Sequence, residues 1–229
     1  MTARSPITEK PSKLRWYQWR LRSLFILTLL VAVGMSWLTV EMRNERRQKA
    51  AAEEITKMGG RVESEPTWLA KLFRDDSLVR VTRVVLPKST TDGDLAVLRD
   101  LSQLQVLMLQ DTKVTGAGLV HLEGLSQLQG LDFFGSQVTD AGLVHLRWLR
   151  RLQLLGLQST RITDAGLVHL EEMKELQQLV LTGTTVTDAG LEHLKGLTHL
   201  QELYLVNTKV TDHGIKKLQQ ALPNCKIEH

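Results

Sequence analysis

The chain has 229 residues, of which 42% are hydrophobic and 24% are charged, values that are ordinary for a folded protein. Its formal net charge of +4 is concentrated in residues 1–22, where six Lys or Arg face one acid, so the other 207 residues sum to −1. A nucleic-acid-binding surface on the folded part is therefore not expected. The single cysteine, Cys225, excludes an intramolecular disulfide and a cysteine-based zinc site.

Residues 1–22 form a basic N-terminal arm, and residues 23–40 follow as an uncharged, largely apolar run of 18 residues. As a helix this run is roughly 27 Å long, just enough to cross the hydrocarbon core of a membrane. Aromatic residues flank it as interfacial anchors do: Trp16, Tyr17, Trp19 and Trp37. We therefore expect a single transmembrane helix at 23–40.

A cleaved signal peptide is the rival interpretation, because Ala32 and Gly34 form a small-x-small pair. The apolar run continues past this pair to Val40, which is long for a signal peptide and favours a retained anchor. The positive-inside rule compares six Lys or Arg in residues 1–22 with five in residues 41–60. This small difference favours a cytoplasmic N-terminus with the rest of the chain outside.

Residues 41–60 are rich in helix-forming Glu, Arg, Lys, Gln and Ala, and are expected to continue the helix as a stalk. Residues 61–76 are expected to cap the folded domain. They contain a short helix that begins near Pro66 and whose apolar side consists of Trp68, Leu69, Leu72 and Phe73. The open end of a repeat array exposes core side chains, and we expect this apolar side to cover them.

Residues 77–220 are repetitive. Five consecutive blocks of 24 residues share the pattern LxxLxxLxLxxTxVTDxGLxHLxx, and the first of them begins at Leu101. This period and leucine spacing are typical of leucine-rich repeats. Residues 77–100 keep the pattern with one residue deleted, as an atypical terminal repeat does. Residues 221–229 are expected to form the C-terminal cap, since Ile227 falls 24 residues after Leu203.

Each block contains the same local signals. The L-x-L pair predicts a short strand with one buried side. A hydroxyl that can hydrogen-bond the following turn recurs at Thr112, Ser136, Thr160, Thr184 and Thr208. An aspartate predicted to be the helix N-cap recurs at Asp140, Asp164, Asp188 and Asp212. Gly116 takes the aspartate position in the first block, which predicts a weaker helix start there.

The fold class is therefore α/β: a leucine-rich-repeat solenoid with short parallel strands on its concave face and helices on its convex face, preceded by a single transmembrane helix. The VTDxGLxHL element at 138–146, 162–170 and 186–194 resembles the short repeats of bacterial membrane-anchored, internalin-like leucine-rich-repeat proteins. It is also similar to the cysteine-containing repeats of F-box proteins, but the cysteine position is Thr or Ser here and no F-box is found. The resemblance implies a fold and a topology, and leaves the activity open.

The concave face is the candidate binding surface, because its strand residues alternate with the buried leucines. Exposed apolar side chains usually mark interaction sites, and Tyr and Met are enriched at interfaces. The simpler alternative is that these side chains only help to pack short strands. The candidate binding residues are Val106, Met108, Gln110, Asp132, Phe134, Leu154, Gln158, Val180, Glu202, Tyr204 and Val206.

Histidine is a common metal ligand and recurs at His121, His145, His169 and His193, which makes a metal array one interpretation. Repetition of one tolerated residue is the preferred explanation, because no carboxylate partners are expected beside them. No phosphate-binding, hydrolase or metalloprotease motif is found, so no enzyme activity, catalytic residue, metal or cofactor is predicted.

The sequence favours a membrane-anchored module that binds a protein partner through its concave strand face. The alternative is a structural, self-associating spacer of the cell envelope without a dedicated partner. Neither hypothesis calls for a nucleic acid or a small-molecule substrate.

Overall fold

The structure is a computed structural model that describes residues 13–229, with side-chain environments from Leu24 onward. Most of the predicted basic arm therefore lies outside the described residues. The chain forms two compact units, which meet between Asn44 and Glu45. The helix α1 (Lys13–Lys57) is continuous across this boundary and is 45 residues long.

The first unit contains the apolar part of α1. Among the described residues, α1 is the one helix long and apolar enough to cross a membrane, a test that a signal sequence also passes. Its large apolar side chains from Leu24 to Val40 are more than half exposed, except for that of Leu38. Within this unit no packed core covers them, a pattern shared by membrane spans and signal sequences.

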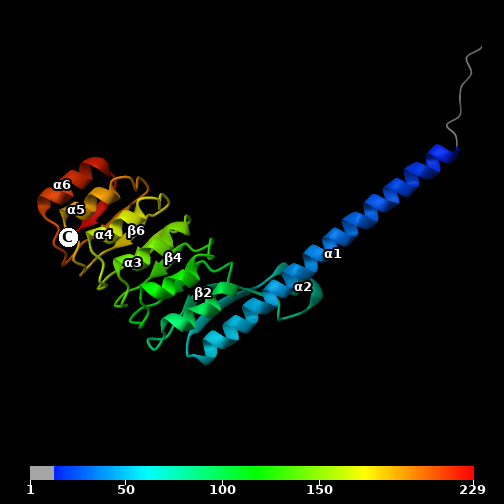
Figure 1. Cartoon of the computed structure of the whole chain (residues 1–229), viewed down its shortest axis with the longest axis horizontal. Helices are drawn as coiled ribbons and strands as arrows, with labels where there is room; N and C mark the ends of the chain where they lie inside the picture. Colours follow the sequence, from blue (N-terminus) through cyan, green and yellow to red (C-terminus); the bar gives the residue numbers. More distant parts are fainter. Residues whose placement is uncertain (1–12) are drawn as a thin grey trace, which may run out of the picture. The chain divides into compact units, whose positions relative to one another are not determined.

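The second unit is a solenoid built on one eight-stranded sheet whose spatial order follows the chain (Figure 1). Strand β1 (Arg61–Pro66) pairs antiparallel with β2 (Val79–Val85), and every later pair is parallel. The later strands are β3 (Val106–Met108), β4 (Gly130–Asp132), β5 (Leu154–Gly156), β6 (Gln178–Val180), β7 (Glu202–Tyr204) and β8 (Lys226–Glu228). From β3 onward the partners in adjacent strands lie 24 residues apart, so the register follows from the sequence period.

Short helices connect the strands on one side of the sheet (Figure 1). The 3₁₀ helices η1 (Asp92–Asp100) and η2 (Gly116–Leu122) come first. Three α-helical turns, each continued by a 3₁₀ turn, follow: α3 (Asp140–Leu143), η3 (Val144–Trp148), α4 (Asp164–Leu167), η4 (Val168–Leu170), α5 (Asp188–Leu191) and η5 (Glu192–Leu194). The last helix is α6 (Asp212–Ala221). Gly116 thus begins a segment without an α-helical turn, in agreement with the predicted weak start.

The core lies between the sheet and these helices. The central residue of the strands in the five complete repeats is fully buried: Leu107, Leu131, Leu155, Leu179 and Leu203. The turn hydroxyls behave as predicted in four repeats, because the threonine hydroxyls donate to the carbonyl oxygen three residues earlier at 2.6–2.8 Å. Ser136 differs, since its buried hydroxyl has no hydrogen-bond partner among the described residues.

The predicted helix N-caps are wrong by one residue. The N-cap is the preceding threonine (Thr139, Thr163, Thr187 or Thr211), and the aspartate is the first helical residue. Its carboxylate instead reaches the next repeat and accepts hydrogen bonds from the backbone amide and the hydroxyl of a threonine. Four such pairs occur, namely Asp92–Thr115, Asp140–Thr163, Asp164–Thr187 and Asp188–Thr211. We call this series the Asp–Thr ladder.

A glycine two residues after the helix-starting position makes room for the ladder. A Cβ on Gly166 would collide with the Asp140 carboxylate of the repeat before. Gly116 has no carboxylate, so the Asp–Thr ladder has no hydrogen-bonded pair at Thr139. The backbones of Gly116 and Gly142 approach each other there instead. A Cβ on Gly142 would lie 2.5 Å from the Gly116 Cα atom.

The N-terminal end of the solenoid is closed differently from the prediction. Ala51 and Ile55, on the last turns of α1, belong to the repeat core, so this segment packs on the first strands and is not a free stalk. The helix α2 (Trp68–Phe73) buries only Leu69 and Ala70. The expectation that Trp68, Leu72 and Phe73 cover the open core is wrong, because all three side chains are exposed.

Candidate binding surface

The eleven predicted binding residues lie on strands β3 to β7 or directly after them. They alternate with the buried leucines, so their side chains lie on the face of the sheet opposite the core. We call this side the open strand face. Most of its apolar side chains are half-buried by their neighbours, whereas Leu154 and Val206 are 38% and 39% exposed.

Four of the predicted residues line one hollow of about 340 Å³: Val106, Met108, Asp132 and Leu154. Its floor is the backbone of β3 and β4, where Gly130 contributes no side chain. A Cβ on Gly130 would meet only Val106, at 3.5 Å or more, so the space above this glycine is open. The missing side chain in the middle of the face therefore creates the hollow.

Asp132 supplies the charge at this hollow. One of its carboxylate oxygens accepts the Gln110 side-chain amide at 2.6 Å, and the other accepts the Phe134 backbone amide at 2.9 Å. Gly156 on the next strand leaves space for this carboxylate, because a Cβ there would collide with it. Asp132 is thus held in place by its neighbours while it stays half-exposed.

A second group of polar side chains lies further along the open strand face. The Glu202 carboxylate accepts hydrogen bonds from the Gln178 amide at 2.8 Å and from the Tyr204 hydroxyl at 3.0 Å. The hydrogen bond to Glu202 raises the pKa of Tyr204 above its usual range. Gln158, Val180 and Val206 also lie on this face outside the hollow. Four of the predicted residues therefore line the hollow, and the others lie elsewhere on the open strand face.

The prediction missed Arg83, Gln129 and Gln153, which complete the rim of the hollow. Arg83 lies on β2 beside Val106, and its guanidinium is 3.7 Å from the Glu63 carboxylate. Gly130 in the middle of a strand was the available signal, since a strand glycine often marks a close approach or a ligand. The register that brings Arg83 to Val106 passes through the shortened repeat, where the 24-residue count no longer applies.

Two of the four recurrent histidines have a carboxylate neighbour, contrary to the expectation. The Nδ1 atom of His145 lies 2.7 Å from Glu123, and that of His193 lies 2.6 Å from Glu171, because stacking of the repeats brings residues 22 positions apart together. Within the described part of the chain, no group of three or more His, Cys, Asp or Glu could hold a metal ion.

Comparison with known proteins agrees with this architecture. A family model described as "Leucine Rich repeat" matches residues 196–218. An internalin from Listeria monocytogenes is 25% identical with a TM-score of 0.51, and the alignment covers 58% of this chain and 36% of that one. Internalin C2 of the same species (24% identity, TM-score 0.49) and a leucine-rich-repeat protein from Leptospira interrogans (20%, 0.44) each align over 58% of this chain, and over 54% and 39% of their own.

The family model and the internalin structure both agree with the fold. The chain has a leucine-rich-repeat fold similar to that of the Listeria internalin, and folds of this kind serve protein–protein interaction in general. It spans between about a third and about half of the length of the matched structures. No curated protein sequence matches it.

Proposed function

We propose that this protein is a membrane-anchored binding module whose open strand face holds a protein partner. The hollow above Gly130 carries the proposal. It combines apolar walls, of which Leu154 is exposed and Val106 and Met108 are half-buried, with one oriented carboxylate. Binding energy in protein interfaces is concentrated where an anchor side chain fills such a pocket.

The walls and charge of the hollow indicate the chemistry of the partner. Val106, Met108 and Leu154 favour an apolar anchor side chain, and Asp132 favours a donor or a positive charge next to it. Arg83 on the rim lies 3.7 Å from Glu63, and Asp132 is the acidic residue that lines the hollow. A partner segment with an aliphatic or aromatic residue next to Lys or Arg fits both features.

Anchoring is supported by the exposed apolar run of α1, which we propose to be retained as a single membrane span with the N-terminus in the cytoplasm and the repeats outside. Alkaline extraction of membranes tests retention, because an integral anchor stays in the pellet. Protease added to sealed, right-side-out cells tests orientation. Repeats protected from that protease would contradict the proposed topology.

Photo-crosslinking tests the binding surface. A photoreactive residue at Leu154, on the open strand face, is compared in native membranes with one at exposed Glu175, outside that face. We expect a distinct crosslinked protein from position 154 alone, identified by mass spectrometry. Crosslinks only between copies of this chain would favour the structural spacer.

Two variants sharpen the test. Gly130→Leu fills the hollow and should remove the crosslink, as should the double change Phe134→Ser with Tyr204→Ser if the partner extends along the face. Gly124→Ala is the matched control, since nothing lies within 4 Å of its Cβ position. A crosslink that survives Gly130→Leu unchanged would show that the partner does not use the hollow.

A further inference from the structure

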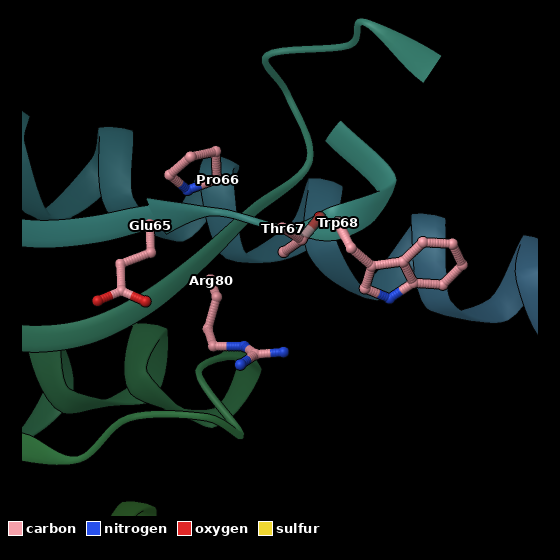
Figure 2. A pocket seen from close by; sticks show the side chains of 5 residues that line it. All are labelled: Glu65, Pro66, Thr67, Trp68 and Arg80. Atoms are coloured by element: carbon pink, nitrogen blue, oxygen red, sulfur yellow. The ribbon is translucent and has the colours of Figure 1, made fainter. Parts of the chain in front are cut away.

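The exposed side of α2 is unexplained by the repeats. Trp68, Leu72 and Phe73 are 53%, 63% and 46% exposed, although the helix has only six residues. Lys71 and Arg74 beside them are exposed as well. Figure 2 shows Trp68 at a hollow that it lines together with Glu65, Pro66, Thr67 and Arg80. Exposed apolar side chains gathered on one short helix usually mark an interaction surface.

The helix α2 is firmly attached to one short segment of α1. The Thr67 hydroxyl, at the N-cap of α2, accepts the Ala70 amide and donates to the buried carboxylate of Glu45 at 2.8 Å. Just beyond the other end of α2, Asp75 forms an ion pair with Arg46 at 3.0 Å. Both ends of α2 are therefore tied to consecutive residues of α1.

These residues closely follow the apolar run. Five residues lead from Val40 to Glu45, and a chain spans at most about 3.6 Å per residue, so Glu45 stays within about 18 Å of the end of the run. The headgroup region on each side of the hydrocarbon core is roughly 5–8 Å thick. Chain connectivity alone thus keeps the attachment point of α2 near the surface of any bilayer that the run crosses.

We propose that α2 is a second membrane contact, in which Trp68, Leu72 and Phe73 enter the headgroup layer of the bilayer that α1 crosses and Lys71 and Arg74 face anionic lipid headgroups. The inference rests on the proposed anchoring. Tryptophan is enriched at this level of membrane proteins, and short apolar faces with basic flanks bind there. Lys71 and Arg74 offer positive charge to anionic lipid, and α2 itself has no acidic residue. Of the two aspartates that follow Arg74, Asp75 is paired with Arg46 and Asp76 is exposed.

The test uses the full chain in vesicles of phosphatidylcholine and phosphatidylglycerol. An environment-sensitive NBD label is attached at Leu72→Cys, at Met35→Cys inside the apolar run, and at Thr198→Cys, an exposed position on the last complete repeat. Burial raises the pKa of the native Cys225 thiol to about 11, so a brief reaction at neutral pH labels the introduced cysteine. Doxyl-labelled lipids then quench only those labels that contact lipid.

We expect quenching and a shift of the emission to shorter wavelength at positions 35 and 72, and neither at 198. If the label at position 35 is quenched and the label at position 72 behaves like the label at position 198, the second contact is overturned and the anchor is retained. A shifted but unquenched label at 72 would also overturn the membrane contact, and would assign this side of α2 to a second copy of the chain, the one protein in the vesicles. Absence of quenching at 35 would refute the anchor and the second contact together.

Discussion

Asp140 accepts two hydrogen bonds from Thr163, at 2.8 Å from its backbone amide and at 2.6 Å from its hydroxyl, and so joins one repeat to the next. In a solenoid each repeat contacts only its neighbours, so bonds between repeats maintain cooperativity. The Asp–Thr ladder forms the same pair of hydrogen bonds at four junctions between repeats. The junction that contains Gly116 lacks them.

Removal of one rung should destabilise the solenoid. Asp164→Ala leaves the Thr187 amide and hydroxyl without their acceptors, and we expect a loss of about 1–3 kcal/mol in the free energy of unfolding. Asp164→Asn keeps one acceptor oxygen for the amide and should lose less. Denaturant unfolding of the full chain in nanodiscs measures both, and equal stability of Asp164→Ala and the native chain would refute the structural role of the ladder.

The Gly116–Gly142 contact should not tolerate a methyl group. In Gly142→Ala the new Cβ meets backbone that cannot move independently, and we expect a destabilisation of about 1–3 kcal/mol, as for overpacked cores. Gly124→Ala is the control, because its Cβ enters open space and the loss of chain entropy in the unfolded state stabilises by about 0.4–1 kcal/mol. The melting temperatures of the two variants should move in opposite directions.

The last turns of α1 should be essential for the stability of the first strands, β1 and β2. Ile55 is fully buried in the repeat core, so Ile55→Ala should cost about 2–4 kcal/mol locally. Glu54→Ala, at an exposed neighbour on the same helix, should cost little. Hydrogen exchange should accelerate in β1 and β2 of the Ile55 variant while β7 keeps its protection. Unchanged exchange in β2 would mean that this segment is a stalk after all.

Acid should weaken the attachment of α2 to α1 and the Asp–Thr ladder before it unfolds the core. Hydrogen bonds from Ser77, then the bond and charge of Arg46, lower the pKa of Asp75 from 3.8 to about 2. Hydrogen bonds from Thr211 likewise lower the pKa of Asp188. Both pKa values are depressed in the folded state, so each carboxylate stabilises the fold above its ordinary pKa and loses this effect in acid. For Asp75 the loss falls between about pH 4 and about pH 2. Exchange at α2 should rise over this range, and Asp75→Asn should remove that dependence.

The turn hydroxyls should differ in how much each contributes to the stability of the fold. Thr160→Val deletes a hydroxyl that donates to the Leu157 carbonyl at 2.6 Å, and should cost about 1 kcal/mol. Ser136→Ala deletes a hydroxyl that has no partner among the described residues, so its stability should stay within about 0.5 kcal/mol of the native chain. Equal losses in the two variants would contradict this distinction.

The repeat period predicted most of the solenoid, because one-sided burial of Leu107 and its equivalents admits a single register. It could not assign the partner of Asp140, since a side chain next to a helix start can bond its own turn or the neighbouring repeat. The hollow required knowledge of which residues lie beside Gly130 across strands, and Arg83 reaches it through the one repeat that breaks the period.

The covering role of the last turns of α1 was missed for a different reason. The covering segment of α1 buries Glu45 and Gln48 along with Ala51 and Ile55, so its hydrophobic pattern is weak. The Gln48 side-chain oxygen accepts the Val81 amide at 3.0 Å, which makes a polar residue part of the contact with the sheet. In α2, by contrast, the apolar pattern is strong but faces outward.

The sharing of α1 between two units limits how the protein can be processed. The apolar run ends at Val40, and the residues that hold the first repeat begin at Glu45. A protease that removed the whole apolar run and kept these contacts would have to cut within residues 41–44. A cut beyond Gln48 would remove the side chains that bond Thr67 and Val81, and would release repeats whose first strand is destabilised.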